Sequence, residues 1–360
     1  MATKIDEYIK SLVFEGVSDI HFKVFRPPLV RVHGVLQPVN APIMGQKDIT
    51  DLAMHILSPD SWEKFIKVSE FDASYSIPGF ARFRVSIFKQ RGSISLVMRI
   101  IPFEVPTLDF LRVPPIVKKI ALSTRGLILV TGVTGSGKSS TLAGMVNYIN
   151  SNSKCHIITI EDPIEFLHRD NQASINQREI GADTDNFIKA FRAALRQDPD
   201  IILVGELRDL ESMEIALRAA ETGHLVLSTV HTTDAKETVG RFIDSFPPYQ
   251  QKQIRLQLAA NLGAVISQRL LERADGKGRI LAAEIMIVNA TIRELISSPE
   301  KTNEILDTME KLREQFQMQS FDQAIMDLVN QGLITIDEGV RNATNPNDFK
   351  VKLRLGAGNK

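Results

Sequence analysis

The sequence lacks several features that define other classes of protein. Only one cysteine, Cys155, occurs among its 360 residues, so it can form neither an intramolecular disulfide nor a zinc site with several cysteine ligands. We expect Cys155 to be a small buried apolar residue, and a reducing compartment such as the cytoplasm fits this content. No stretch approaches the ~18 apolar residues of a membrane span, so the sequence predicts no transmembrane segment.

Net charge is absent as well, because 43 basic side chains balance 43 acidic ones. Proteins that bind nucleic acid normally carry a basic excess or a clustered basic face, so we expect no nucleic-acid partner.

Residues 1–13 place Ile5, Tyr8, Ile9 and Leu12 at helical spacing with charged residues between them. This pattern predicts a short amphipathic helix and is unlike a signal peptide.

The local patterns divide the chain into four parts. Residues 1–101 contain several strand-like runs around a helical stretch at 48–67, which predicts a small α+β domain. Prolines restrict their own backbone and that of the preceding residue, so residues 102–115 are predicted to form an extended linker. We expect a second domain over residues 116–290 and a helical C-terminal segment over residues 291–360.

Apolar runs alternate with helical patterns in the second domain. The runs are Leu127–Thr131, His156–Glu161, Ile201–Val204 and Leu225–Thr229. Nearly continuous apolar strands separated by helices are typical of a parallel sheet that is covered on both faces. The sequence therefore predicts an α/β fold with a parallel-rich sheet for this domain.

A complete phosphate-binding motif follows the first of these strands. The segment GVTGSGKS at 132–139 matches the P-loop pattern and opens a predicted helix. Its glycines let backbone N–H groups surround phosphate oxygens, and the helix N-terminus adds partial positive charge. We expect ATP here, with Lys138 at the β- and γ-phosphates and Ser139 as a Mg²⁺ ligand. The predicted nucleotide-binding residues are Gly132, Thr134, Gly135, Ser136, Gly137, Lys138, Ser139 and Ser140.

Hydrolysis also requires a group that activates water and groups that hold the metal. Glu206 follows the apolar run at 201–204 and is the predicted general base. Many P-loop proteins carry a metal-holding Asp where this chain has Gly205. Glu161, Asp162 and Glu165 follow the preceding strand, and at least one of them is expected to address Mg²⁺, because ligands collect at the carboxyl ends of parallel strands.

Histidine and arginine residues complete the predicted site. His231 lies in a polar cluster after a fourth buried strand and is a candidate sensor of the γ-phosphate. In the first domain, strand periodicity places Arg82 and Arg84 on one face and aliphatic residues on the other, and Arg99 follows the same rule. These arginines either form a solvated sheet face or act as arginine fingers on a neighbouring subunit's phosphates. The second alternative requires an oligomer.

Together these segments resemble the hexameric ATPases of type IV pilus and type II secretion systems, and within them the pilus retraction ATPases (the PilT/PilU family). The resemblance covers nearly the whole chain. It rests on the P-loop, the acidic segment 160–165, the atypical Walker B segment 198–206, the His-containing segment 223–232, the segments 176–179 and 205–209, and the first-domain pairs Arg82–Arg84 and Gln90–Arg91.

The resemblance implies a PAS-like first domain joined to a RecA-like ATPase domain. It also implies a homo-hexameric ring in which ATP lies between the ATPase domain of one chain and the arginines of a first domain. Its partner would be an inner-membrane platform protein of the pilus, with the ring peripheral at the cytoplasmic face of that membrane. Lys138 and Ser139 would then bind phosphates and Mg²⁺, and Glu206 would activate water.

Two features place the resemblance on the retraction branch, and one leaves the exact role open. Assembly ATPases of the family carry an additional N-terminal region and usually a four-cysteine zinc element, whereas this chain starts at the PAS-like domain. Retraction ATPases carry an Ala-Ile-Arg-Asn-Leu-Ile motif, and the matching segment 291–296 (TIRELI) differs at two positions. A retraction motor is the leading hypothesis; the alternatives are an accessory ring that assists a paralogous retraction ATPase, an assembly ATPase and a nucleic-acid translocase.

Overall fold

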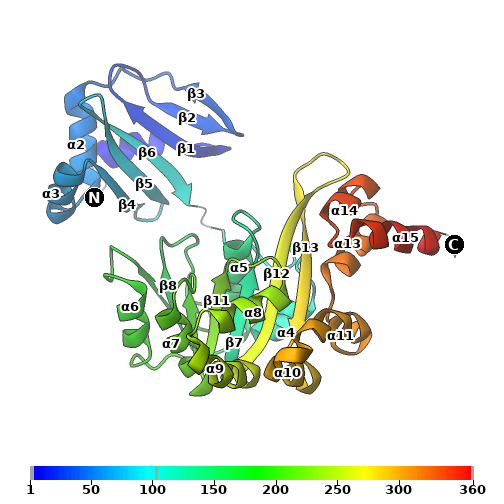
Figure 1. Cartoon of the computed structure of the whole chain (residues 1–360). Helices are drawn as coiled ribbons and strands as arrows, with labels where there is room; N and C mark the ends of the chain where they lie inside the picture. The colour runs from blue at the N-terminus through cyan, green and yellow to red at the C-terminus, as the bar shows by residue number, and fades with distance from the viewer. Residues whose placement is uncertain (1–3, 102–103, 358–360) are drawn as a thin grey trace. The chain divides into compact units, whose positions relative to one another are not determined.

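The computed structural model describes residues 4–101 and 104–357 (Figure 1). It divides the chain into two compact units. The first comprises Met1–Glu104 with Glu165–Leu167, and the second comprises Val105–Ile164 with His168–Lys360. Each unit has its own sheet and its own apolar core.

The first unit is built on an antiparallel sheet with the strand order β3-β2-β1-β6-β5-β4 (Figure 1). Its strands are β1 Val17–Lys23, β2 Leu29–Val32, β3 Val35–Pro38, β4 Glu70–Ile77, β5 Ala81–Gln90 and β6 Ser93–Ile101. Three helices, α1 Lys4–Ser11, α2 Gln46–Ile56 and α3 Pro59–Val68, share a core with one sheet face. This face carries Phe83, Val85 and Ile87, all fully buried, as the alternation along β5 predicts.

The helical stretch predicted at 48–67 is two helices, because the helix ends before Pro59. Pro59 lacks a backbone N–H and therefore fits the first turn of a helix but not its interior. Ser58 caps the new helix α3, since its side chain accepts a hydrogen bond from the Ser61 backbone N–H at 3.2 Å. Periodicity alone did not distinguish one long helix from two.

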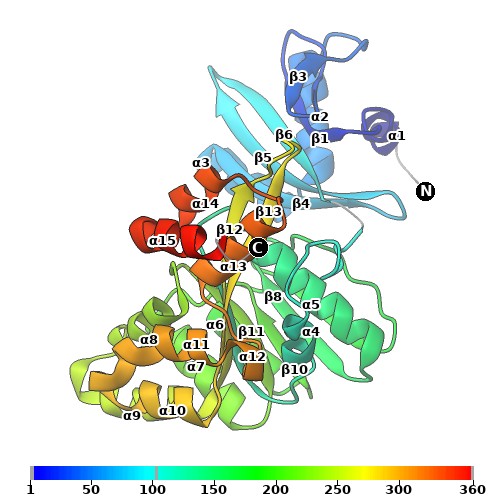
Figure 2. The ribbon, with the colours of Figure 1, turned by 90° about the vertical axis from the view of Figure 1, so that its right-hand side faces the viewer.

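The second unit contains a sheet with the order β13-β12-β7-β11-β10-β8-β9, in which only β13 runs antiparallel to its neighbour (Figure 2). The strands are β7 Gly126–Thr131, β8 His156–Glu161, β9 Ser174–Glu179, β10 Ile201–Val204, β11 Leu225–Val230, β12 Leu262–Glu272 and β13 Arg279–Ile287. The predicted α/β fold with a parallel-rich sheet is therefore confirmed. The carboxyl ends of β7, β8, β10 and β11 lie at one edge of this sheet, which is where such folds bind ligands.

Helices cover both faces of this sheet (Figure 2). The helices α4 Ile116–Ala121 and α5 Lys138–Asn152 share one core with the sheet. The opposite core includes residues of α6 Phe187–Ala194, α7 Leu210–Glu221, α8 Ala235–Asp244, α9 Pro248–Asn261, α10 Ala290–Ser297 and α11 Ile305–Lys311. The described ranges contain no helix that is long and apolar enough to span a membrane.

The C-terminal part is helical but broken into short pieces. After α10 come the 3-10 helix Pro299–Glu304, α11, α12 Arg313–Phe316, α13 Phe321–Asn330, α14 Ile336–Asn342 and α15 Pro346–Ala357. The last three pack around the far end of the β12–β13 hairpin in a separate small core. Leu271 and Ile280 of the hairpin are buried there with Phe321 and Phe349.

Some local features differ from expectation. Residues 107–113 form hydrogen-bonded turns in place of an extended linker, and Leu108 and Val113 are buried in the core of the second unit. Strand β9 and helix α9 were not predicted, since the first has a polar sequence at the sheet edge and the second has no clear apolar stripe. Cys155 is free and half-buried.

Candidate nucleotide and catalytic site

The P-loop connects β7 to α5 in a conformation that requires glycine. Gly132 has φ 140° and Gly137 has φ 91°. A Cβ atom at Gly132 would lie 2.5 Å from Ser136 Oγ and 2.6 Å from the Gln268 carbonyl oxygen. Any side chain here would therefore displace the loop backbone that is expected to surround phosphate.

The backbone N–H groups in the first turn of a helix point toward its N-terminus, and the N-terminus of α5 adjoins the P-loop. Gly137 is the N-cap of this helix and makes no side-chain capping bond. Ser139 is exposed and Ser140 half-buried in this first turn, while Thr134 and Gly135 are exposed at the loop tip. An uncapped helix N-terminus with free donors is a ready anion-binding site.

Lys138 lies against the loop and is buried to all but 8% of its surface. Its Nζ donates to the Gly132 carbonyl oxygen at 2.8 Å and to the Val133 carbonyl oxygen at 3.0 Å. Burial lowers the pKa of Lys138, and the nearby Glu206 carboxylate opposes that shift. The lysine is thus held at the point where a phosphate would arrive.

Glu206 follows β10 and is joined to the P-loop lysine through His231. Glu206 Oε2 accepts a hydrogen bond from Arg208 Nε at 2.7 Å, and Oε1 lies 3.1 Å from His231 Nε2. His231 Nδ1 in turn lies 3.5 Å from Lys138 Nζ. The structure therefore brings together three predicted site residues from three separate strand ends.

The backbone around Glu206 is held from both neighbouring strands. The Gly205 N–H donates to the Ile160 carbonyl oxygen at 2.8 Å, and Thr229 Oγ1 donates to the Gly205 carbonyl oxygen at 2.8 Å. A Cβ atom at Gly205 would lie 3.4 Å from that same Ile160 oxygen. Glycine at this position allows β10 to lie close to β8 directly before the carboxylate.

The acidic segment after β8 divides into one anchored and two exposed carboxylates. Glu161 Oε1 accepts hydrogen bonds from Thr159 Oγ1 at 2.6 Å and from Gln177 Nε2 at 3.1 Å. Asp162 and Glu165 are exposed. Within the described residues, no group of three or more His, Cys, Asp or Glu side chains forms a ready metal site.

Two residues of this site were not predicted individually. Gln177 on β9 contacts Glu161 and also accepts a hydrogen bond from the His168 backbone N–H at 2.8 Å. Arg208 contacts Glu206. Both lie in segments that carried the family resemblance, and only that signal could have indicated them, because an isolated Gln or Arg at a strand end has no distinctive pattern.

The three predicted arginines lie on β5 and β6 of the first unit. Arg84 is exposed and Arg82 half-buried on the face opposite Phe83, and Arg84 pairs in register with Arg99 on β6. Arg99 Nε donates to Asp19 Oδ1 at 2.9 Å. Burial raises the pKa of Asp19, but hydrogen bonds from Ser18 and Arg99 outweigh it, so this pKa lies below its usual value.

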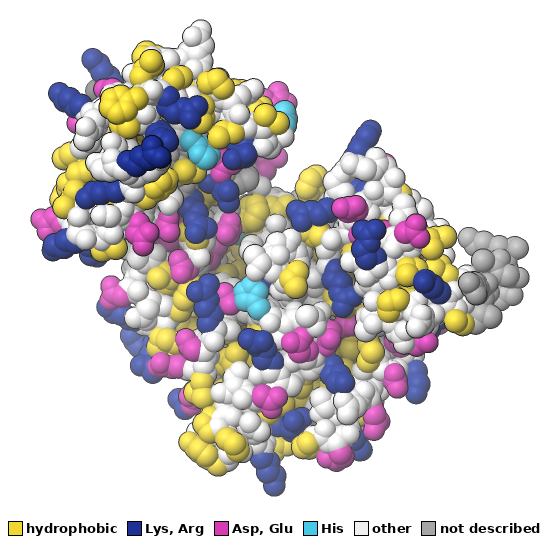
Figure 3. All heavy atoms as spheres, turned by 45° about the horizontal axis from the view of Figure 1, so that its top comes forward, with side chains coloured by type: hydrophobic (Ala, Val, Ile, Leu, Met, Phe, Trp, Pro, Cys, Tyr) yellow, Lys and Arg dark blue, Asp and Glu magenta, His cyan; other side chains and the backbone are white. Residues whose placement is uncertain are grey.

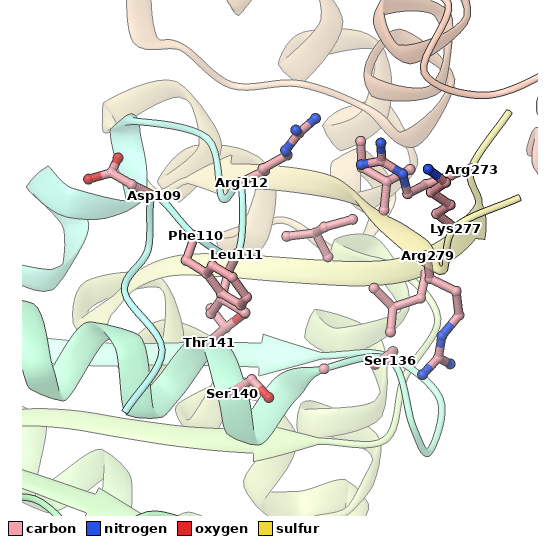
Figure 4. A pocket seen from close by; sticks show the side chains of 14 residues that line it. Asp109, Phe110, Leu111, Arg112, Ser136, Ser140, Thr141, Arg273, Lys277 and Arg279 are labelled. Carbon is pink, nitrogen blue, oxygen red and sulfur yellow. The ribbon is translucent and has the colours of Figure 1, made fainter. Parts of the chain in front are cut away.

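A pocket of about 570 Å³ opens beside the P-loop in the second unit (Figure 4). It is bounded by the turn at 109–112, the first turns of α5 and the β12–β13 hairpin. Ser136, Gly137, Ser140 and Thr141 form the side nearest the phosphate-binding loop. The pocket is therefore continuous with the predicted phosphate site.

These features define the class of protein. A nucleotide-binding α/β ATPase domain has a P-loop between a parallel strand and a helix, a strand-end glutamate linked to the P-loop lysine and an adjoining pocket.

Basic and acidic side chains are interspersed over the lower part of the molecular surface in Figure 3.

Comparison with known proteins gives the family. Residues 1–341 match the family described as type II/IV secretion system protein. The chain is 45% identical to a twitching motility protein of Neisseria gonorrhoeae over 89% of this chain and 85% of that one. It is 42% identical to the type IV pilus retraction ATPase PilT of Pseudomonas aeruginosa, covering 96% and 99% of the two chains.

Solved structures agree with the sequence comparison. A crystal structure of the pilus retraction motor PilT with bound ADP matches with a TM-score of 0.87 and 42% identity, covering 97% of this chain and 99% of that one. The ATPase DotB of Legionella pneumophila matches with a TM-score of 0.80 and 28% identity, covering 99% and 95% of the two chains. The chain belongs to the type II/IV secretion system family and, within it, to the type IV pilus retraction ATPases.

Proposed function

We propose that this chain is a Mg²⁺-dependent ATPase that works in a homo-hexameric ring and powers retraction of a type IV pilus. The observation that carries the catalytic part is the linked group Glu206, His231 and Lys138 at the carboxyl edge of the sheet. The names of the relatives, a twitching motility protein and a pilus retraction ATPase, support the cellular part.

In the proposed reaction each residue has a separate role. The P-loop amides and Lys138 bind the β- and γ-phosphates, and Glu206 takes a proton from the attacking water. His231, which lies between the base and the lysine, senses whether a γ-phosphate is present. Arg208 keeps the Glu206 carboxylate oriented, because it contacts one oxygen while His231 lies at the other.

The donor set fits magnesium. Mg²⁺ prefers oxygen ligands and retains several waters, so it needs only one or two protein groups besides the phosphates. The exposed Ser139 hydroxyl and a carboxylate among Glu161, Asp162 and Glu165 supply such oxygens. When bound, the metal neutralises charge that develops on the phosphates.

The ring is proposed because the predicted arginine fingers belong to the first unit. Arg82, Arg84 and Arg99 would contact the nucleotide of a neighbouring subunit, and hydrolysis would rotate the units against each other. The ring would act on an inner-membrane platform protein from the cytoplasmic face of the membrane. We infer this location from the resemblance to the pilus retraction ATPases, and we expect no nucleic-acid substrate.

The deciding experiment is live imaging of labelled pili in cells whose only copy carries Glu206→Gln. If the chain is a retraction motor, abundant pili extend and never shorten. Absence of pili would identify an assembly ATPase instead. Normal extension and shortening would mean that another protein supplies the force.

One observation favours a second candidate, an accessory ring that assists a paralogous retraction ATPase. The chain is 37% identical to the type IV pilus ATPase PilU of Pseudomonas aeruginosa over 98% of its length. It also departs from the retraction motif within helix α10 at Thr291 and Glu294, where Glu294 contacts Lys301 at 2.6 Å. Under this alternative, deletion of the protein weakens retraction only against load while a paralogue remains.

A further inference from the structure

A second pocket, of about 480 Å³, borders the P-loop between strand β12 and helix α14. The linked group Glu206, His231 and Lys138 does not line this pocket, and neither does the turn at 109–112 that bounds the first one. Its side nearest the predicted γ-phosphate position is formed by the tip of the P-loop and by Thr233, which follows His231 by two residues. The pocket is therefore a neighbour of the catalytic group and distinct from it.

The charged residues that line this second pocket are all arginines. Arg269, Arg279 and Arg341 line it, and no aspartate or glutamate does. Arg279 extends from β13 toward the P-loop at Ser136 and lines both pockets (Figure 4). A cleft lined by charge of one sign focuses the electric field and raises the local concentration of ions of the opposite sign. The lining therefore favours an anion.

Arg269 is held in one orientation. Its guanidinium lies 3.8 Å from the Phe321 ring centroid, and Nη1 donates to the Asn342 carbonyl oxygen at 2.7 Å. A guanidinium has five N–H donors, so these contacts leave donors for a ligand. Burial lowers the pKa of Arg269, and the acidic groups that oppose this shift lie outside the pocket lining: Glu284, Asp322 and Asp234.

The other two arginines are exposed. No carboxylate of the described ranges lies at ion-pair distance from Arg279, whereas Arg341 Nη1 lies 3.2 Å from Glu338 Oε2. The ion pair of an exposed arginine contributes little to stability, so Arg341 can turn to an anion in the pocket at low cost. Arginine suits phosphate in particular, because its planar fork places two parallel N–H donors on two phosphate oxygens.

Two buried side chains of the lining keep a polar atom without a partner. Ser136 is 3% exposed and Gln268 is 1% exposed. Neither Ser136 Oγ nor Gln268 Oε1 has a hydrogen-bond partner among the described residues, although Gln268 Nε2 donates to Thr141 Oγ1 at 2.6 Å. Such atoms are uncommon in folded proteins. A hydrogen phosphate ion matches both, since its oxygens accept from a hydroxyl and its own O–H donates to an amide oxygen.

We propose that this pocket binds orthophosphate beside a bound nucleotide, and that the phosphate it takes is the product of hydrolysis at Glu206. The inference rests on the proposed ATPase function. Arg269, Arg279 and Arg341 supply the cationic donors. A phosphate that leaves the P-loop on the side of His231 meets the loop tip and Thr233 first, so the pocket retains it next to the site before it escapes.

The first test titrates inorganic phosphate into the purified full-length protein by calorimetry, with Mg²⁺ and the non-hydrolysable analogue AMP-PNP at saturation. The analogue fills the β- and γ-phosphate positions of the P-loop, so additional phosphate has to bind elsewhere. We expect phosphate to bind the loaded protein, whereas sodium chloride of equal ionic strength should give no binding signal. Absence of phosphate binding to the loaded protein would overturn the inference and leave the ATPase function intact.

Binding of AMP-PNP is measured separately beforehand. Its failure to bind would contradict the proposed nucleotide function alone. The pocket is then tested by titrating phosphate into Lys138→Ala, which lacks the P-loop cation but keeps the three arginines. Phosphate binding to that variant supports the pocket, and its absence rejects it.

Variants of the two exposed arginines test the assignment of the pocket. Arg279→Gln combined with Arg341→Gln should weaken phosphate binding at least about 10-fold, since one hydrogen bond to a charged group is worth about that factor. Arg279→Lys combined with Arg341→Lys keeps the charge and should lose less. Arg196→Gln, an exposed arginine outside the pocket, is the matched control. Unchanged affinity in the Gln variant rejects the pocket as the site.

The source of the phosphate is tested by the rate of its release. After a single turnover of ATP, followed with a fluorescent phosphate sensor, the Gln variant should release phosphate about 10-fold faster than the wild type. Weakened binding with an unchanged release rate would show that the pocket takes phosphate from solution and would overturn the product assignment. A Gln variant that instead no longer assembles, as measured by light scattering, would assign the pocket to an acidic segment of a second copy and would also overturn the proposal.

Discussion

At the scale of single residues, the site depends on short contacts between side chains that are distant in the sequence. Glu206 is linked to the P-loop lysine through His231, which follows a different strand. The carboxylate that is proposed to activate water is therefore held in place by two neighbours, Arg208 and His231, before any nucleotide is bound.

Replacement of Glu206 by Gln tests the assignment of the general base. The amide keeps the shape of the side chain but cannot accept a proton from water. We expect kcat for ATP to fall by about 10²–10⁴-fold while ADP binds with unchanged affinity. Glu300→Gln, at an exposed site on the 3-10 helix, should change neither quantity. Undiminished turnover in Glu206→Gln would assign the base elsewhere.

A second residue-scale prediction concerns Glu284 on β13. Burial raises the pKa of this carboxyl to about 7, against the hydrogen bond that its Oε1 accepts from the Ala235 N–H at 2.8 Å. Because the folded state then binds the proton more tightly than the unfolded chain, protonation of Glu284 at low pH increases the free energy of unfolding. That contribution is lost as pH rises from about 4.5 to 7, by about 3 kcal/mol in total.

Chemical denaturation at pH 5 and pH 8 measures this effect. The wild type should lose more unfolding free energy between the two pH values than Glu284→Gln, because the amide keeps the Ala235 contact and does not titrate. The difference between the proteins isolates Glu284 from other titrating groups. Equal pH dependence in both would contradict the raised pKa.

At the scale of elements, the β12–β13 hairpin joins the nucleotide site to the C-terminal helices. The Gln268 carbonyl of β12 lies close to Gly132, and the next residue, Arg269, stacks 3.8 Å from the Phe321 ring centroid at the start of α13. Arg269 Nη1 also donates to the Asn342 carbonyl oxygen of α14 at 2.7 Å. Strand β12 thus contacts both the P-loop and the C-terminal helices.

The small terminal core can be tested at Phe349 of α15, which is fully buried. Phe349→Ala removes a large side chain and should cost about 3–5 kcal/mol of local stability. Hydrogen exchange should accelerate in α13–α15 and remain unchanged in the first unit, whose core is separate. Val351→Ala on the exposed side of the same helix is the control. Equal protection of α15 in both variants would show that this core does not hold the helix.

At the scale of the whole molecule, the proposed ring predicts that catalysis needs two chains. Lys138 and Glu206 belong to the second unit, while Arg82 and Arg84 belong to the first. An arginine finger supplied by a neighbour contributes about 10³–10⁵ in turnover where it has been measured. Arg84→Ala should then lose most activity without loss of fold, because Arg84 is exposed.

Mixed rings separate action within a chain from action between chains. Lys138→Ala and Arg84→Ala are each expected to be inactive alone. If the arginine acts on a neighbour, equal mixing with subunit exchange restores up to about a quarter of the sites, since one intact lysine then meets one intact arginine. A mixture as inactive as its components would mean that both residues serve the same chain's site, or that Arg84 belongs to a solvated sheet face.

Much of this protein was determined by its sequence alone. The P-loop lies within eight consecutive residues, so the glycines that need positive φ and the helix that follows can be identified without knowledge of the fold. The buried strands of the second unit and the opposite placement of Arg84 and Phe83 also follow from local periodicity, which depends only on neighbours along the chain. The break before Pro59 and the polar edge strand β9 did not follow, because there local pattern gives two answers or none.

Only the tertiary structure decided which of these residues meet. The strand order β7-β11-β10-β8 places His231 between Glu206 and Lys138, although the three lie far apart along the chain. The pairing of β9 with β8 brings Gln177 to Glu161, and the β12–β13 hairpin beside β7 borders a pocket together with Phe110. Distances between segments depend on how a sheet orders its strands and on the packing of its faces, and no local pattern encodes them.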